Sequence, residues 1–229
     1  IGAVTDTGRL VLLDVVSTTE VPRTEGAPGL AGATQVRQLV DIEPEEKVVG
    51  LVPVGSAEHA PIVLATAGGV IKRVKPGDEP RNAESWEVIS LSEGDRVVFA
   101  DTAADTDFLA LVTSDAQLLR FQAAKVRPQG RGAGGMAGIS LREGARVVAG
   151  AAVPEDLLAE AVVVTVAGAE GSLPGTGGGS VKVPPLDRYP AKGRATGGVR
   201  SHRFLRGEDE LVAAWVGVAP ARALRDGGK

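Results

Sequence analysis

The sequence predicts an all-β fold, a propeller-like disc of about four or more four-stranded blades. Aromatic residues make up only 3% of the 229 residues, while Val, Ala and Gly dominate, and this bias favours short strands with tight turns. A charged-then-apolar segment also recurs at Lys47, Arg96, Arg146 and Glu210, at steps of 49, 50 and 64 residues. Units of about 50 residues, each with about four short strands, are typical of propeller blades.

Each unit is expected to contain a β-hairpin. An apolar strand ending in Thr, a turn and a second short strand occur at residues 4–10, 62–73 and 109–120, and a fourth copy lies at 162–183. β-branched residues flank Gly or Asp positions that tolerate tight-turn geometry. The fourth turn is lengthened by the Gly-rich residues 171–180, which we interpret as a flexible loop.

These repeats predict one domain. Residues 154–161 begin with Pro and indicate a single helical turn, which we place in a loop between blades. Residues 221–229 are expected to be a frayed tail. The approximate blades are residues 1–55, 56–104, 105–153 and 154–220.

Two segments share a basic, Gly-rich pattern, and we call residues 126–139 and 189–200 the first and second Gly-Arg loops. Both contain Gly-Arg, a small residue and Gly-Gly, with the arginines at Arg131 and Arg194. Glycines let a backbone approach a large anion closely, and arginine offers phosphate a planar fork. The first loop also matches G-x-G-x-x-G, but the βαβ context of a dinucleotide site is missing.

Charge is segregated along the chain. The formal net charge of −4 conceals a local charge of +5 over residues 117–150 and of +6 over residues 181–206. Residues 82–116 instead hold eight acidic side chains against Arg96 alone. Such segregation favours steering of a polyanion, and we expect the acidic arc to face away from it.

The repeated hairpin and basic loop, and above all the run Gly193-Arg194-Ala195-Thr196-Gly197-Gly198-Val199-Arg200, resemble the C-terminal domain of the A subunit of bacterial type IIA topoisomerases, DNA gyrase and topoisomerase IV. The resemblance implies a β-pinwheel with strand-swapped blades and a basic rim that binds and bends duplex DNA. It also implies that the chain is a fragment without catalytic residues, because the catalytic tyrosine of such subunits lies in a preceding region.

The same resemblance implies the partners. They are duplex DNA, the catalytic core and the ATPase subunit of an ATP-dependent topoisomerase in the bacterial cytoplasm, associated with the nucleoid. No cofactor is expected in this domain, whereas the holoenzyme uses ATP and Mg. No membrane and no small-molecule substrate are expected.

Two departures from the family matter. The box Gln-Arg-Arg-Gly-Gly-Lys-Gly of gyrase subunits is missing from the sequence, and the corresponding loops at residues 23–30 and 79–86 are acidic and degenerate. Four units are also fewer than the usual five or six. The chain therefore resembles a topoisomerase IV-like subunit or a gyrase-like subunit without the box.

The expected DNA contacts are basic residues of the hairpins, of the Gly-Arg loops and of the segment that follows the second loop. They are Lys72, Arg73, Lys75, Arg120, Lys125, Arg127, Arg131, Lys182, Arg188, Lys192, Arg194, Arg200, Arg203 and Arg206. Arg131 and Arg194 are expected on the outer edge of the disc and outside any central channel.

Other functions fit less well. A propeller scaffold for protein–protein interaction, without a DNA role, is the main alternative. His59 and His202 are too few for a three-histidine metal site and assemble no nucleophile–base pair, and we interpret His202 as a rim residue. Tyr189 is assigned to packing or a phosphate hydrogen bond, and Trp86 and Trp215 to blade cores.

Overall fold

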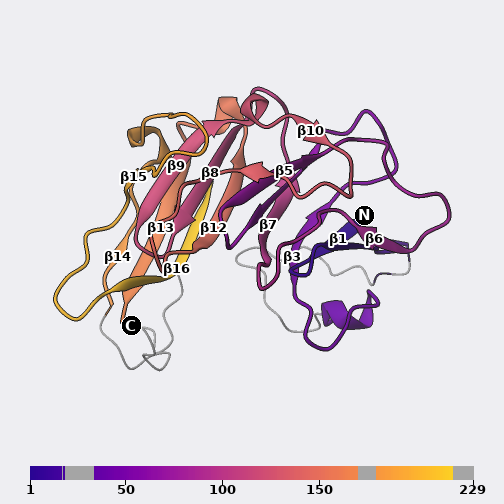
Figure 1. Ribbon diagram of the computed structural model, residues 1–229, viewed down its shortest axis with the longest axis horizontal. Coiled ribbons are helices and arrows are strands. Elements are labelled where there is room, and N and C mark those ends of the chain that lie inside the picture. The colour runs from indigo at the N-terminus through magenta and orange to yellow at the C-terminus, as the bar shows by residue number, and fades with distance from the viewer. Residues whose placement is uncertain (17, 19–33, 170–178, 219–229) are drawn as a thin grey trace, which may run out of the picture.

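The computed structural model describes residues 1–16, 18, 34–169 and 179–218, and its four β-sheets stand side by side (Figure 1). Three sheets contain a central hairpin: β1 (Gly2–Thr5) with β2 (Arg9–Leu12), β4 (Ile62–Thr66) with β5 (Val70–Val74), and β8 (Phe108–Thr113) with β9 (Gln117–Gln122). In the fourth, β13 (Ala161–Gly168) pairs with the short β14 (Val181–Lys182). The all-β prediction and the hairpins are thus confirmed.

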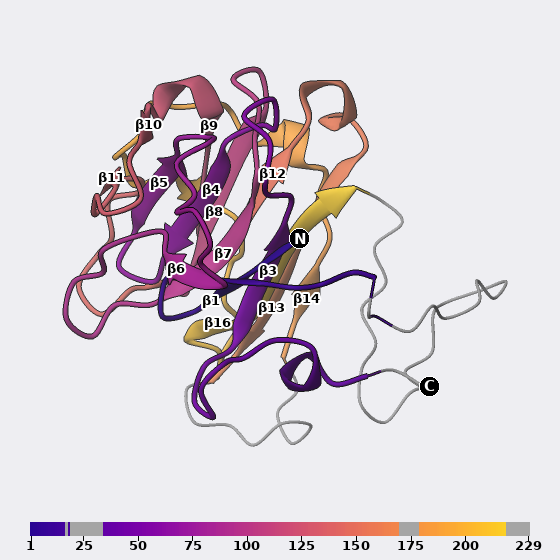
Figure 2. The ribbon, with the colours of Figure 1, turned by 90° about the vertical axis from the view of Figure 1, so that its right-hand side faces the viewer.

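One further strand completes the inner side of each sheet. These strands are β3 (Val48–Val52), β7 (Val97–Thr102), β12 (Val147–Val153) and β16 (Glu210–Val218), and they contain or directly follow the charged-then-apolar repeats. They contact one another in the order β3, β7, β12, β16. Figure 2 shows β1, β3 and β6 of the first sheet nearest the viewer, with the other sheets behind.

Neighbouring sheets approach closely because the inner strands carry glycine at the contact. A Cβ added at Gly50 on β3 would lie 2.1 Å from the carbonyl oxygen of Ala100 on β7, and one at Gly150 on β12 would lie 2.7 Å from the Phe99 ring. One backbone bond also recurs between sheets: Val97 N–H donates to Asp6 O, Val147 N–H to Ala67 O, and Leu211 N–H to Ser114 O, at 2.8–2.9 Å.

The outer edge of each of the first three sheets is closed by a strand from the following unit. β6 (Ser85–Glu87) pairs with β2, β11 (Met136–Ala137) and β10 (Pro128–Gln129) pair with β5, and β15 (Val199–Arg200) pairs with β9. A sheet is therefore not one contiguous stretch of sequence. The predicted blade ranges contain the hairpins and inner strands, but each range after the first lends its loop strand to the preceding sheet.

Short 3₁₀ turns connect the strands. They are η1 (Val36–Gln38), η2 (Ala123–Lys125), η3 (Glu155–Leu157) and η4 (Leu186–Arg188). η3 lies between β12 and β13, where the Pro-started helical turn was predicted. The predicted loop at residues 23–30, most of the loop at 171–180 and the tail at 221–229 lie outside the described residues.

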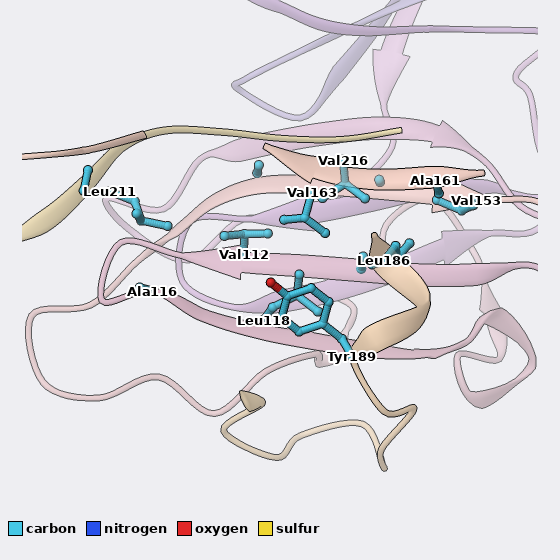
Figure 3. Packing of buried hydrophobic residues seen from close by; sticks show 14 residues of the cluster. Val112, Ala116, Leu118, Val153, Ala161, Val163, Leu186, Tyr189, Leu211 and Val216 are labelled. Atoms are coloured by element: carbon cyan, nitrogen blue, oxygen red, sulfur yellow. The ribbon is translucent and has the colours of Figure 1, made fainter. Parts of the chain in front are cut away.

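The largest apolar cluster lies between the third and fourth sheets (Figure 3). Val112, Leu118, Val163 and Val216 come from strands of both sheets, and Tyr189 joins them with 8% exposure. Tyr189 Oη donates to Ser201 O at 3.4 Å, which confirms the packing role. Among the described residues, no helix is long and apolar enough to cross a membrane.

Of the two tryptophans, Trp86 packs against the core between the first and second sheets. The prediction for Trp215 is wrong: it is 45% exposed and lines a hollow between the inner strands, with Val49, Phe99 and Ala151. Trp215 lies on β16, the last inner strand in the described part of the chain, so no further sheet packs over it there.

Candidate nucleic-acid interface

Both Gly-Arg loops lie at the outer ends of their sheets, because each is anchored to the second strand of a hairpin. In the first loop, Pro128 lies opposite Arg73 and Met136 opposite Ile71 on β5. In the second, Ala191 forms a parallel bridge with Arg120, and Val199 lies opposite Leu118 on β9. The two loops therefore occupy equivalent places on successive blades, away from the hollow between the inner strands, as predicted.

The same register identifies an arginine that sequence reasoning missed. Trp86 on β6 lies opposite Leu10 on β2. Met136 and Val199 hold the equivalent positions on the next two sheets, so these three residues are the anchors of the three loops. Arg81, Arg131 and Arg194 each stand five residues before the anchor of their loop. Arg81 is exposed, and it was overlooked because its loop lacks the Gly-Gly pair that the two Gly-Arg loops share. The available signal was spacing, since Arg81 precedes Arg96 by 15 residues and Arg131 precedes Arg146 by the same 15.

The first Gly-Arg loop is held from below by a buried lysine. Lys72 on β5 has no exposed surface, and its Nζ donates to the carbonyl oxygens of Arg131 and Ala133, both at 2.6 Å. Burial lowers the pKa of Lys72 to about 8, with Asp78 acting in the opposite direction. Asp78 Oδ2 also accepts the backbone N–H of Arg131 at 2.8 Å. The half-buried Arg131 guanidinium makes no hydrogen bond to the described residues.

The second Gly-Arg loop is held differently. Leu119 takes the place of Lys72 on β9, as the register of the two sheets shows. Lys192 Nζ donates to Gly198 O at 3.0 Å, and the Arg194 guanidinium donates to Ala137 O. These two cations, both predicted to contact DNA, thus already bind backbone oxygens.

Three predicted contact residues are not on an exposed surface, and the expectation of an exposed rim position is wrong for them. Lys72 is buried as described. Arg73 is 2% exposed, and its guanidinium donates to the carbonyl oxygens of Ala103, Ala123 and Val126 and forms an ion pair with Asp105 at 2.7 Å.

The third is Arg120, which is 7% exposed and lies 4.9 Å from the centre of the Phe108 ring. Burial lowers its pKa, and Asp187 opposes that change. The sequence-based prediction failed here because period-2 patterning cannot distinguish an exposed charged side chain on a strand from one that a loop of the next unit covers.

The other predicted contact residues lie at the surface. Arg131 and Arg194 are half-buried. The nine exposed predicted contact residues are Lys75, Lys125, Arg127, Lys182, Arg188, Lys192, Arg200, Arg203 and Arg206.

Two other arginines that contribute to the local charge of +5 over residues 117–150 form ion pairs. Arg142 contacts Asp115 at 3.3 Å and Arg146 contacts Glu210 at 2.9 Å, so the local charge overstates the number of unpaired cations.

Comparison with known proteins shows which family shares this sequence and fold. The family profile described as DNA gyrase C-terminal domain, beta-propeller, matches residues 107–154 and 175–214. The A subunit of DNA gyrase from Mycolicibacterium smegmatis is 31% identical over 190 residues, which cover 81% of this chain and 21% of that protein. The chain belongs to the DNA gyrase A C-terminal domain family. The gyrase A protein of a Nocardioides species is also 31% identical, over 79% of the chain and 22% of its own length.

Solved structures show the same β-pinwheel fold for this family member. The C-terminal domain of DNA topoisomerase IV superimposes with a TM-score of 0.72 at 20% identity, covering 94% of this chain and 62% of that one. The E. coli ParC C-terminal domain gives a TM-score of 0.57 at 16% identity, covering 95% and 81%. The chain spans about a fifth of the length of the curated relatives.

In this gyrase A C-terminal domain, His202 is not the rim residue that we predicted. It is 2% exposed, with Nδ1 and Nε2 each 2.8 Å from a hydroxyl oxygen, of Thr165 and Ser180 respectively. Ser180 Oγ donates to Glu208 at 3.0 Å. The carboxylate thus contacts the serine and not the imidazole, which differs from a Ser-His-acid triad. No cluster of three or more potential metal ligands occurs among residues that the structure describes.

Proposed function

We propose that the domain binds duplex DNA along the outer edges of its sheets, with little dependence on base sequence, and bends it. The observation that carries this proposal is the repeated loop, which presents an arginine at the same position of three successive units: Arg81, Arg131 and Arg194. Nine further exposed cations lie in or near the hairpins and loops. The family supports it, because its relatives are gyrase A proteins.

The proposed mechanism is electrostatic. Lys and Arg on successive edges neutralise phosphates and release counterions, which accounts for affinity without base contacts. Neutralising one side of a duplex favours a curved path, which offsets an elastic bending cost of about 1–6 kcal/mol for a short site.

The curved segment would then be presented to the catalytic core of a type IIA topoisomerase, topoisomerase IV-like or gyrase-like, which works with an ATPase subunit. ATP and Mg would act in that holoenzyme and not in this domain, and the holoenzyme would lie in the cytoplasm, associated with the nucleoid.

A salt titration tests the proposal. The affinity for a mixed-sequence duplex should fall with log salt at a slope of about −0.9 per neutralised phosphate, so a multi-phosphate edge predicts a slope of several units. Absence of binding at low salt would contradict the proposal.

Charge reversal locates the surface. The double variant Arg131→Glu/Arg194→Glu should reduce the magnitude of the salt slope by about 1.8, because two phosphate contacts are lost. Lys47→Glu is the control for each single reversal, since it makes half the charge change of the double variant at an exposed residue outside the loops and should leave the slope unchanged. An unaltered slope in the double variant would remove the Gly-Arg loops from the interface.

A second candidate is contact with another protein. Leu51 on β3 and Val212 and Trp215 on β16 are 55%, 53% and 45% exposed, and large apolar side chains at a surface favour protein association. The double variant Val212→Ser/Trp215→Ser should abolish such contact and leave DNA affinity unchanged.

A further inference from the structure

The turn at residues 130–135 of the first Gly-Arg loop has one backbone hydrogen bond of its own, from Ala133 N–H to Gly130 O at 3.0 Å. Four of its six residues are glycine, and glycine loses more backbone freedom on folding than any other residue. Its only side chains are those of Arg131 and Ala133, and the Arg131 side chain binds none of the described residues. The position of this turn on the sheet therefore depends on contacts from outside it.

Two side chains, those of Lys72 and Asp78, anchor the turn beside one backbone bond, from Ser90 N–H to Ala133 O at 3.3 Å. The Lys72 ammonium lies beneath the turn and donates to the carbonyl oxygens at both ends of its Arg131–Gly132–Ala133 segment. Asp78 accepts the N–H of Arg131, so both backbone groups of the residue that carries the guanidinium are bound. The next sheet has Leu119 at the place of Lys72, so the strand itself does not require a cation there.

The second loop shows the alternative arrangement. That loop has the equivalent backbone bond, from Ser140 N–H to Thr196 O at 3.1 Å. It has no buried lysine beneath it, and its own cations, Lys192 and Arg194, bind Gly198 O and Ala137 O. A cation bound to the protein backbone must give up that bond, or share it, to bind a phosphate. In the first loop the buried lysine does the holding, and the guanidinium stays available.

We propose that Lys72 is a positioning residue for Arg131: its buried ammonium holds the Gly-rich turn so that the Arg131 guanidinium is presented to a DNA phosphate. This rests on the proposed DNA-binding function. Arg131, and not Lys72, touches the phosphate, so Lys72 acts only through the loop.

A double-mutant cycle on the whole chain tests the inference. The affinity for a mixed-sequence duplex is measured against salt for wild type, Lys72→Met, Arg131→Gln and the double variant. Each single variant should reduce the magnitude of the salt slope by about 0.9. When the salt concentration rises fourfold, the factor by which the affinity of the variant falls should then be about 3.5 times smaller than the factor for wild type. The double variant should show no further reduction, because both changes remove the same phosphate contact.

Three controls make the result specific. Leu119→Met places methionine at the equivalent position of the next sheet and should leave the slope unchanged. Arg194→Gln combined with Lys72→Met should give reductions that add. Asp78→Ala removes the second anchor and leaves the buried cation in place. Its effect on the salt slope should also vanish when Arg131 is already Gln. This variant tests the inference if circular dichroism shows that Lys72→Met does not fold.

The outcomes separate the inference from the proposed function. If Arg131→Gln reduces the slope but Lys72→Met and Asp78→Ala do not, or reduce it equally in both Arg131 backgrounds, the positioning role is wrong while DNA binding stands. If wild type shows no salt-dependent DNA binding, the proposed function itself fails.

Discussion

Several polar side chains of this domain serve the fold from buried positions. The His202 cluster is the most constrained example. Ser180 Oγ donates to Glu208, so it accepts from His202 Nε2–H, and Nδ1 accepts from Thr165 Oγ1. The register places His202 where the two preceding units have the buried Ile89 and Ile139. A neutral imidazole therefore replaces an apolar core residue and ties the start of β14 to the loop before β16.

This neutral imidazole predicts acid sensitivity. Burial lowers the pKa of His202, Lys182 lowers it further and Glu208 opposes them. A group whose pKa is depressed on folding stabilises the protein above its unfolded value, about 6.5 for histidine, and that contribution is lost as pH falls through the folded pKa. Melting temperatures at pH 8 and pH 5 should therefore differ more for wild type than for His202→Ile.

The pKa of Glu208 is also lowered, mainly by the N–H of Leu205, so this carboxylate contributes acid sensitivity of the same sign. Glu208→Gln separates the two contributions. If His202→Ile and wild type lose equal stability between the two pH values, the imidazole is not the acid-sensitive group.

At the scale of elements, the inner strands determine how closely the sheets pack. Glycine recurs where adjacent inner strands touch, at Gly50 against Ala100 and at Gly150 against Phe99. These are contacts between successive units of sequence. The two glycines lie on β3 and β12, one at each contact with β7, which has Phe99 and Ala100 there.

Filling one of these positions should separate two sheets. Gly50→Ala would place a methyl group 2.1 Å from a backbone oxygen, and overpacking of this kind costs about 1–3 kcal/mol or more. Denaturant unfolding measures the loss. Gly132→Ala, where a Cβ meets nothing within 4 Å, is the matched control. Equal free energies of unfolding for the two variants would show that the inner strands can move apart without loss of stability.

For the whole molecule, strand exchange links each unit to the one before it. The loop strands β6, β11 and β15 each close the outer edge of the preceding sheet, and the loop arginines lie just before these strands. A line of arginines at successive outer edges thus follows from the way in which the sheets are completed.

Arg81 tests whether this line extends to the first sheet. Arg81→Gln should reduce the salt slope of DNA binding by about 0.9, and its effect should add to that of Arg131→Gln because the two loops belong to different blades. Arg96→Gln is a suitable comparison, since Arg96 is paired with Asp6 at 2.8 Å. A slope unchanged by Arg81→Gln would restrict the interface to the two Gly-Arg loops.

Local patterning in the sequence predicted the all-β class, the hairpins, the helical turn at η3 and the two Gly-Arg loops. Period-2 patterning and turn residues act within a few positions of one another, and the repeat of about 50 residues shows the same local pattern several times along the chain. The family was equally accessible, because the run around Arg194 is contiguous in sequence.

Which cations are free became clear from the packing of the sheets and loops in three dimensions. Lys72, Arg73 and Arg120 have the sequence pattern of exposed strand charges, but each is covered by a loop from the following unit. Arg81 became visible for the same reason, through the pairing of β6 with β2. The burial of a charge depends on residues tens of positions away, which a local pattern does not encode.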